Sequence, residues 1–183
     1  MSLLRRSRVG ALALALSIPA CRDGTDPQAA HERDPGIAPP SFTLGSGSTS
    51  TLLGRATFGD PAGEPFKVKR ITGDWQVEVK AKPAFDLAIQ SIVFQPGGQS
   101  GWHRHPGPVF IQVVSGTMTF YESDDPTCTP IVRTAGQGYL DLGEHAHIAR
   151  NETTVPAQNV VTYFAPPGAL LRIDQPNPGT CPF

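Results

Sequence analysis

From Thr51 onward, short stretches of the chain alternate between apolar and polar residues. The alternation is clear in WQVEVKA (residues 75–81) and runs longer in AFDLAIQSIVF (residues 84–94). A period of two puts every second side chain on the same face, which is typical of a half-buried β-strand. Further strands are predicted at residues 109–114, 117–122, 130–135, 138–142, 146–151, 159–166 and 169–174. No helical period of any length follows the first twenty residues.

Turn residues separate the predicted strands. The chain holds 19 glycines and 19 prolines, and Ser115-Gly116 has the form of a two-residue hairpin turn between two strands. About ten short strands with turns every 8–12 residues are typical of an antiparallel β-sandwich or β-barrel. A chain of 183 residues is long enough for one domain with a sizeable core. We therefore expect a single all-β domain over residues 51–183.

The first twenty residues, MSLLRRSRVGALALALSIPA, have the pattern of an export signal. Basic residues precede an apolar run from Val9 to Ile18, which is too short to span a bilayer. The junction before Cys21 resembles a bacterial lipoprotein box, in which the cysteine becomes lipid-modified. Simple secretion after cleavage near Ala20 is the alternative. We expect a periplasmic or cell-surface lipoprotein held on the membrane by its lipid, or else a secreted protein.

Residues 21–50 are poor in apolar side chains and rich in proline, glycine and serine, which predicts a flexible tether. From Cys21 onward the chain carries 12 basic and 16 acidic residues, a net charge of −4. That balance gives no indication of a nucleic-acid surface.

Export implies an oxidising compartment, in which cysteines can pair. If Cys21 carries a lipid, Cys128 and Cys181 remain, and an even remainder in an exported chain predicts a disulfide. The bond would close a loop of roughly 54 residues and contribute about 4 kcal/mol to stability on the chain-entropy model. Two free thiols are the alternative.

The stretch GWHRHPGPVF (residues 101–110) resembles the first motif of the cupins, small β-barrels of the jelly-roll type. That motif is a glycine, five residues, His-x-His, three or four residues, a glutamate, six residues and a glycine. Here Gly97 leads to His103 and His105, and Gly116 closes the pattern. Val109 stands where the family has its glutamate.

A second stretch resembles the second cupin motif, which is a glycine, five residues, Pro-x-Gly-x-x-His, three residues and Asn. Gly136 leads at this spacing to His147 and then to Asn151. Leu142 and Glu144 replace the proline and glycine, and Gly143 is expected to make the turn one place early. The resemblance covers residues 85–173 and implies a cupin double-stranded β-helix.

The resemblance implies a metal site made of His103, His105 and His147. In a strand, residues two apart face the same side, about 6.5–7 Å apart, so His103 and His105 can reach one ion. Val109 has the same parity and should form an apolar wall. Three neutral imidazoles leave coordination positions open and suit Fe, Zn, Ni, Mn or Cu without distinguishing among them.

Other residues near the motifs are candidates for the border of the pocket. His145 is expected in the turn at the pocket mouth, with a fourth ligand as the alternative, while Gln99 and Trp102 precede the histidine pair. Glu144 could supply a carboxylate or face solvent.

Fold alone does not decide the function, because cupins include enzymes and binding proteins. One hypothesis is a mononuclear three-histidine oxygenase or similar oxidoreductase that acts on a small organic molecule. A second is a non-catalytic module that binds a sugar-like or apolar ligand. A third is a scaffold that assembles as a homodimer. The sequence identifies no catalytic residue.

Overall fold

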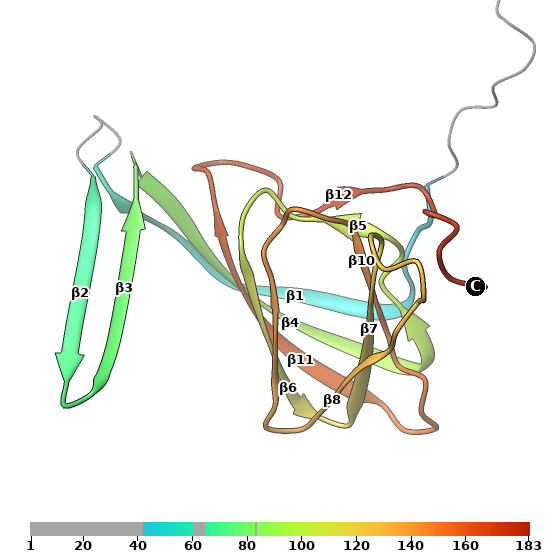
Figure 1. Cartoon of the computed structure of the whole chain (residues 1–183). Helices are drawn as coiled ribbons and strands as arrows, with labels where there is room; N and C mark the ends of the chain where they lie inside the picture. The colour runs from blue at the N-terminus through green and yellow to red at the C-terminus, as the bar shows by residue number, and fades with distance from the viewer. Residues whose placement is uncertain (1–41, 61–64, 83) are drawn as a thin grey trace, which may run out of the picture. The chain divides into compact units, whose positions relative to one another are not determined.

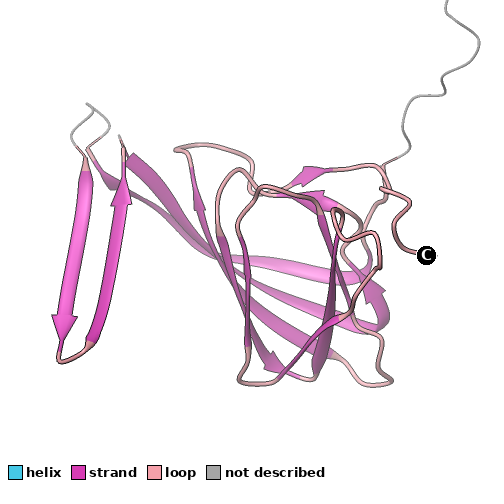
Figure 2. Cartoon of the chain, in the orientation of Figure 1, coloured by secondary structure: helices cyan, strands magenta, loops and turns pink. Residues whose placement is uncertain are grey.

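The computed structural model describes residues 42–60, 65–82 and 84–183, which form strands, turns and loops (Figure 2). Within these ranges there is no helix of the length and hydropathy needed to cross a membrane. The strands are β1 (Ser46–Gly59), β2 (Phe66–Thr72), β3 (Trp75–Ala81), β4 (Ala84–Gln99), β5 (His103–Arg104), β6 (Val109–Ser115), β7 (Thr117–Glu122), β8 (Ile131–Thr134), β9 (Gly138–Asp141), β10 (His147–Arg150), β11 (Ala157–Ala165) and β12 (Ile173–Asp174). The predicted export signal, Cys21 and the tether as far as residue 41 lie outside the described residues.

Ten of these strands form one antiparallel sheet that curls into a nearly closed barrel (Figure 1). The order along the sheet is β12-β5-β10-β4-β11-β6-β9, with β1 beside β4, β7 beside β10, and β8 beside β7. The predicted all-β class is confirmed. Because β5 and β10 are neighbours, the sheet brings the two histidine motifs to the same place in the barrel.

The core follows the period-two pattern that predicted the strands. Buried and partly buried residues alternate along the whole of β11, and Val109, Ile111 and Val113 of β6 are buried while Phe110 is exposed. Main-chain pairing joins β11 to β4 on one side and to β6 on the other. The inward side chains of these three strands therefore enclose the interior of the barrel.

The barrel begins earlier than the sequence pattern indicated. Residues 46–50, which we assigned to the tether, belong to β1 and pair with the end of β4. Every residue of β1 is exposed. Because neither face of this strand is buried, its sequence does not alternate between apolar and polar residues. Its place is set by the backbone ladder and by Arg55 and Thr57, which both donate hydrogen bonds to the carboxylate of Asp86.

Ser115-Gly116 is a corner between two parts of the sheet and not the predicted hairpin turn. Among the strands described, β6 pairs with β11 and β9, whereas β7 pairs with β10 and β8. Gly116 has a φ of +73°, and a Cβ there would lie 2.8 Å from atoms of Ala157. Only glycine fits this left-handed, crowded position, so the chain can pass sharply from β6 into β7.

β2 and β3 form a separate two-stranded sheet. β3 was predicted with the same bounds, whereas β2 was not predicted as a strand. Lys67 and Lys80 of this hairpin are exposed and both lie near Glu78, as expected of a solvated charged face.

Candidate metal centre and cavity

Three histidines meet inside the barrel. His103 begins β5, His105 lies two residues further on, and His147 begins β10 directly opposite His103. All three side chains are buried, and one ligand nitrogen from each lies within 4.8 Å of the other two. The structure thus brings together the three residues that the cupin resemblance selected, as a group that could hold a metal ion.

Main-chain carbonyls orient two of the three rings. Nδ1 of His103 lies 2.9 Å from the carbonyl oxygen of Gly101, and Nδ1 of His105 lies 2.5 Å from that of Leu171. Since a carbonyl oxygen only accepts, both rings carry their proton on Nδ1 and keep the lone pair on Nε2. Neutral imidazole is the form that binds metal, so the donor set fits a divalent transition metal.

Burial keeps His103 and His105 neutral. The pKa of His103 lies well below its ordinary value, because burial disfavours the charged ring and because His147 and His105 lie close to it. Burial is also the main cause that lowers the pKa of His105 to about 4. At neutral pH a metal therefore meets free nitrogen lone pairs on these rings and does not have to displace protons from them.

A buried carboxylate, Asp141 on β9, lies beside the histidines and was missed from the sequence. Its Oδ2 atom lies 3.2 Å from Nδ1 of His147 and 3.7 Å from Nε2 of His105. Its Oδ1 atom accepts a hydrogen bond of 2.7 Å from the N–H of Gly143. Burial favours a higher pKa for Asp141, but His147 and the Gly143 N–H outweigh it and lower the pKa. The group is thus an ionised carboxylate at the edge of the cluster.

Asp141 stands directly opposite Val109 in the ladder that joins β9 to β6. Val109 is fully buried, in agreement with its predicted inward parity. It occupies the motif position at which cupins carry a glutamate, so the carboxylate here comes from the neighbouring strand. One signal in the sequence could have found it: Asp141 shares the inward parity of Tyr139, where an apolar side chain is the usual choice.

Gly143 makes the turn between β9 and β10. It has a φ of +80°, and a Cβ there would lie 2.8 Å from the carbonyl oxygen of Gly107 and 3.0 Å from that of His105. A side chain would push this turn away from the loop that carries His105. The glycine thus keeps Asp141, whose Oδ1 it binds, close to the histidines.

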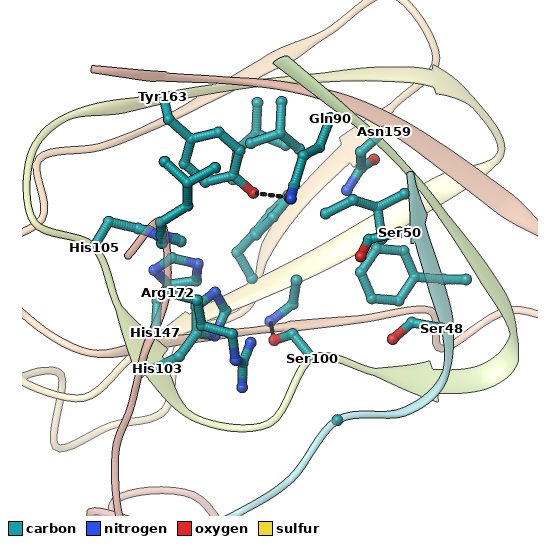
Figure 3. Close-up of a pocket in the computed structure, with 18 residues that line it drawn as sticks. Ser48, Ser50, Gln90, Ser100, His103, His105, His147, Asn159, Tyr163 and Arg172 are labelled. Atoms are coloured by element: carbon teal, nitrogen blue, oxygen red, sulfur yellow. Dashed lines mark hydrogen bonds between the residues drawn. The ribbon is translucent and has the colours of Figure 1, made fainter. Parts of the chain in front are cut away.

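The histidines line one end of a cavity of about 290 Å³ inside the barrel (Figure 3). Apolar side chains such as Ile92, Phe94, Ile111 and Phe120 form much of its wall. Ser48, Ser50 and Asn159 lie together away from the histidines, and Arg172 lies beside them (Figure 3). Among the described residues that line the cavity there is no aspartate or glutamate.

Asn159 and Arg172 have polar atoms to offer a ligand. The side chain of Asn159 is 2% exposed, and its Oδ1 has no hydrogen-bond partner in the described protein. Arg172 donates from Nε to Asp174 at 2.6 Å, and no described residue binds its terminal nitrogens. Sequence reasoning missed both residues. Asn159 has the inward parity of Val161, but nothing local marks Arg172 in the loop before β12.

Three residues expected at the pocket border lie elsewhere. His145 is 55% exposed and sits 3.5 Å from the carboxylate of Asp124, in a surface depression that Glu144 also lines. The amide of Gln99 is used near the strand end, where its Oε1 accepts from the N–H of Gly101. Trp102 is buried in a different cluster, because neighbours in a strand point to opposite sides and His103 takes the inward side.

The predicted disulfide between Cys128 and Cys181 is formed, with the two Cα atoms 5.2 Å apart. It joins the C-terminal segment to the loop after β7. Cys181 packs with Trp102, Tyr121 and Ile148 in a second apolar cluster. Ile148 follows His147 in β10, so this strand faces the cavity with one side chain and the disulfide-linked cluster with the next.

Part of the chain that carries the site is similar to a known family model. Residues 90–163 match the family model Cupin_2, described as a cupin domain. The matched range includes the three histidines and Asp141. Together with this match, the nearly closed antiparallel barrel shows a cupin double-stranded β-helix. No curated protein is significantly similar to the chain in sequence.

Several solved structures are similar to this chain at low sequence identity. The cupin domain of an XRE family transcriptional regulator from Enterobacter cloacae is 16% identical, with 67% of this chain and 99% of that chain covered and a TM-score of 0.42. The polyketide cyclase RemF from Streptomyces resistomycificus is 11% identical, with 75% and 79% covered and a TM-score of 0.47. A recombinant oxalate oxidase in complex with glycolate is 23% identical, with 44% and 42% covered and a TM-score of 0.36.

Proposed function

We propose that this barrel of the cupin type holds a divalent metal ion and acts as an oxidoreductase of the oxygenase kind on a small organic acid. The observation that carries the proposal is the convergence of His103, His105 and His147 at one end of a cavity of about 290 Å³. Bound through these rings, the metal would supply a Lewis acid and, if it is redox-active, one-electron chemistry. The cavity gives a small molecule room beside the ion.

The charges around the cavity favour an anionic ligand. Arg172 is a cation beside the histidines. Val109 stands where the cupin motif has a glutamate, so that carboxylate is missing here. The described residues that line the cavity include no aspartate or glutamate. Asp174 partly offsets Arg172 through its bond to Nε. A carboxylate on the ligand would meet the terminal nitrogens of Arg172 in a bidentate arrangement.

The far end of the cavity favours a hydroxyl on the same ligand. Oδ1 of Asn159 is buried and has no hydrogen-bond partner among the described residues, and an unsatisfied buried acceptor costs about 1–3 kcal/mol. The hydroxyls of Ser48 and Ser50 also line this end. A ligand hydroxyl can donate to the oxygen of an amide or accept from its nitrogen, so it would satisfy Asn159 in either orientation of the amide.

The metal is tested first, on tag-free protein, by inductively coupled plasma mass spectrometry. We expect near-stoichiometric metal, and its loss in the His103→Ala/His105→Ala/His147→Ala variant. Absence of metal in the native protein, with no uptake on reconstitution, would overturn the metal function. Oxygen consumption is then followed with the loaded protein and a panel of hydroxy and keto acids of two to six carbons, with the matching diols as neutral controls.

The organic acid is tested by calorimetric titration of the same panel. We expect Arg172→Gln to weaken the binding of acids about tenfold, the loss of roughly one charge-assisted hydrogen bond, and to leave the diols unchanged. Asn159→Leu should instead weaken the binding of hydroxy acids more than the binding of acids that lack a hydroxyl. Equal binding of acids and diols by the native protein would exclude the proposed ligand class.

A non-catalytic binding module is the second candidate. It is favoured by the absence, among the described lining residues, of any carboxylate or lysine that could transfer protons. The phenol of Tyr163 donates to Gln90 at 2.8 Å, and burial raises its pKa. Tight retention of an acid without turnover, in the metal-loaded protein, would select this function.

We also propose that the barrel works outside the cytosol, anchored through a lipid on Cys21. The disulfide between Cys128 and Cys181 is consistent with an oxidising compartment. Labelling of growing cells with a radioactive fatty acid should mark the native protein and leave the Cys21→Ser variant unmarked. Equal labelling of both would exclude the anchor.

A further inference from the structure

We infer that Asp141 is the carboxylate of the metal centre and that it acts through His147 as a positioning residue. The inference rests on the proposed metal function. The first cupin motif would place a glutamate where this chain has Val109. We infer that Asp141 on β9 provides the negative charge in its place.

The three histidine rings are oriented in the same way, but the group that faces Nδ1 differs in one of them. In each ring Nδ1 lies against an oxygen, but His103 and His105 face neutral carbonyls whereas His147 faces a carboxylate. Among the described residues, neither Nδ1 of His147 nor Oδ2 of Asp141 has a hydrogen-bond partner in good geometry, and the two buried atoms lie 3.2 Å from each other. A small rotation of the ring would let Nδ1–H donate to Asp141. The Nε2 atom of His147 is then left for the metal, as in the other two rings.

A charged acceptor does more than fix a ring. It makes the imidazole a more basic ligand, and loss of such a partner typically costs 10–100-fold in metal affinity. The ligand group consists of the three histidines without Asp141. Asp141 therefore places a negative charge next to the ligand His147 without binding the metal itself. The described residues that line the cavity still include no aspartate or glutamate.

The placement of Asp141 shows that the position is built for a charge. A buried carboxylate is costly unless both oxygens are matched to donors or positive groups. Here Gly143 supplies the N–H to Oδ1, and Nδ1 of His147 lies 3.2 Å from Oδ2. Opposite it, Val109 fills the space with an apolar side chain.

The test compares Asp141→Asn with Asp124→Asn, because Asp124 forms the same type of pair with the exposed His145. Both changes remove one charge and keep the shape of the side chain, and in Asp141→Asn the amide oxygen could still accept from the N–H of Gly143. Affinity for Zn(II) is measured by competition with a chromogenic chelator. We expect Asp141→Asn to weaken it 10–100-fold and Asp124→Asn to leave it within about twofold.

A second readout follows the ring itself. Pulsed electron paramagnetic resonance of the Cu(II)-loaded protein detects the remote Nδ1 nuclei of the ligand histidines. We expect one of the three to differ from the others in the native protein and this difference to disappear in Asp141→Asn. Native Zn(II) affinity and unchanged Nδ1 signals in Asp141→Asn would overturn the inference while leaving the metal centre in place. If the native protein binds no metal, the proposed function itself is wrong.

If Asp141→Asn does not fold, Asp141→Ser provides the same comparison, since it also removes the charge and introduces less bulk. Affinity equal to that of the native protein would again contradict the inference.

Discussion

Two histidine–carboxylate pairs lie close together in the sequence and have opposite surroundings. His147 and Asp141 are buried at 3.2 Å, whereas His145 and Asp124 are about half exposed at 3.5 Å. The two histidines are separated by one residue in the stretch HAHIAR (residues 145–150), and residue type does not distinguish them. Only the buried one joins other histidines in a ligand group.

The surroundings of the two pairs determine how strongly each pair interacts. Around the exposed pair, water competes for both partners and screens the charge, so the pair contributes little energy. Around the buried pair, water is excluded, the acceptor has no alternative partner and the interaction is stronger. Environment, and not residue type, turns the same chemistry into a candidate site.

The strongest test of this comparison removes each histidine in turn. We expect His147→Ala to lower metal affinity by at least about 100-fold, the upper end of what loss of a mere outer partner costs. His145→Ala should leave affinity unchanged, because that side chain lies outside the cavity. Chelator competition measures both. An equal loss in the two variants would mean that His145 belongs to the centre.

The disulfide stabilises the opposite face of the strand that carries His147. Replacing Cys128 and Cys181 by serine should lower the free energy of unfolding by about 4 kcal/mol for a closed loop of roughly 54 residues. Urea denaturation under non-reducing conditions measures the loss. Metal stoichiometry should be unchanged at 25 °C, since the histidines belong to the other face. If the variant lost its metal while its free energy of unfolding stayed unchanged, the disulfide-linked cluster and the histidine site would not be independent.

Acid should destabilise the metal-free protein through its buried rings. His105 has a folded pKa of about 4 against an ordinary value of 6.5, so between these pH values the unfolded chain binds a proton that the folded protein does not. The free energy of unfolding is therefore fully retained above pH 6.5 and falls as the pH drops toward 4, by about 3 kcal/mol for this group. His103 acts in the same direction.

Denaturation of chelator-treated protein at several pH values checks this expectation. The His105→Gln variant serves as the control and should show a shallower decline. A decline as steep in His105→Gln as in the native protein would assign the acid sensitivity to other groups.

The smallest expected effect belongs to the exposed pair. A double-mutant cycle with Asp124→Asn and His145→Gln should give a coupling below about 1 kcal/mol, the usual range for ion pairs in solvent. Thermal denaturation at low and high salt measures it. A coupling of several kcal/mol that persists at high salt would show that the two pairs are not as different as their exposure indicates.

Local pattern was sufficient for much of the barrel. The period-two alternation predicted β3 with its bounds and most of β6 to β11 within a few residues, because a half-buried strand records its two faces in its own sequence. It could not predict β1, which is exposed along its whole length and is held by backbone pairing with β4. The turn sequence Ser115-Gly116 led to the wrong prediction of a hairpin. A turn sequence does not show with which partners the flanking strands will pair.

For this chain, the amino-acid sequence was enough to predict the all-β class and a disulfide between Cys128 and Cys181, and its resemblance to the cupin motifs selected the three histidines. Strand parity, cysteine count and motif spacing can all be read within short segments. Only the tertiary structure decided that Asp141 stands opposite Val109 and behind His147, that Asn159 and Arg172 share a cavity with the histidines, and that His145 lies outside it. Those relations join strands far apart in the chain. They depend on which strands become neighbours when the sheet closes, and no single segment carries that information.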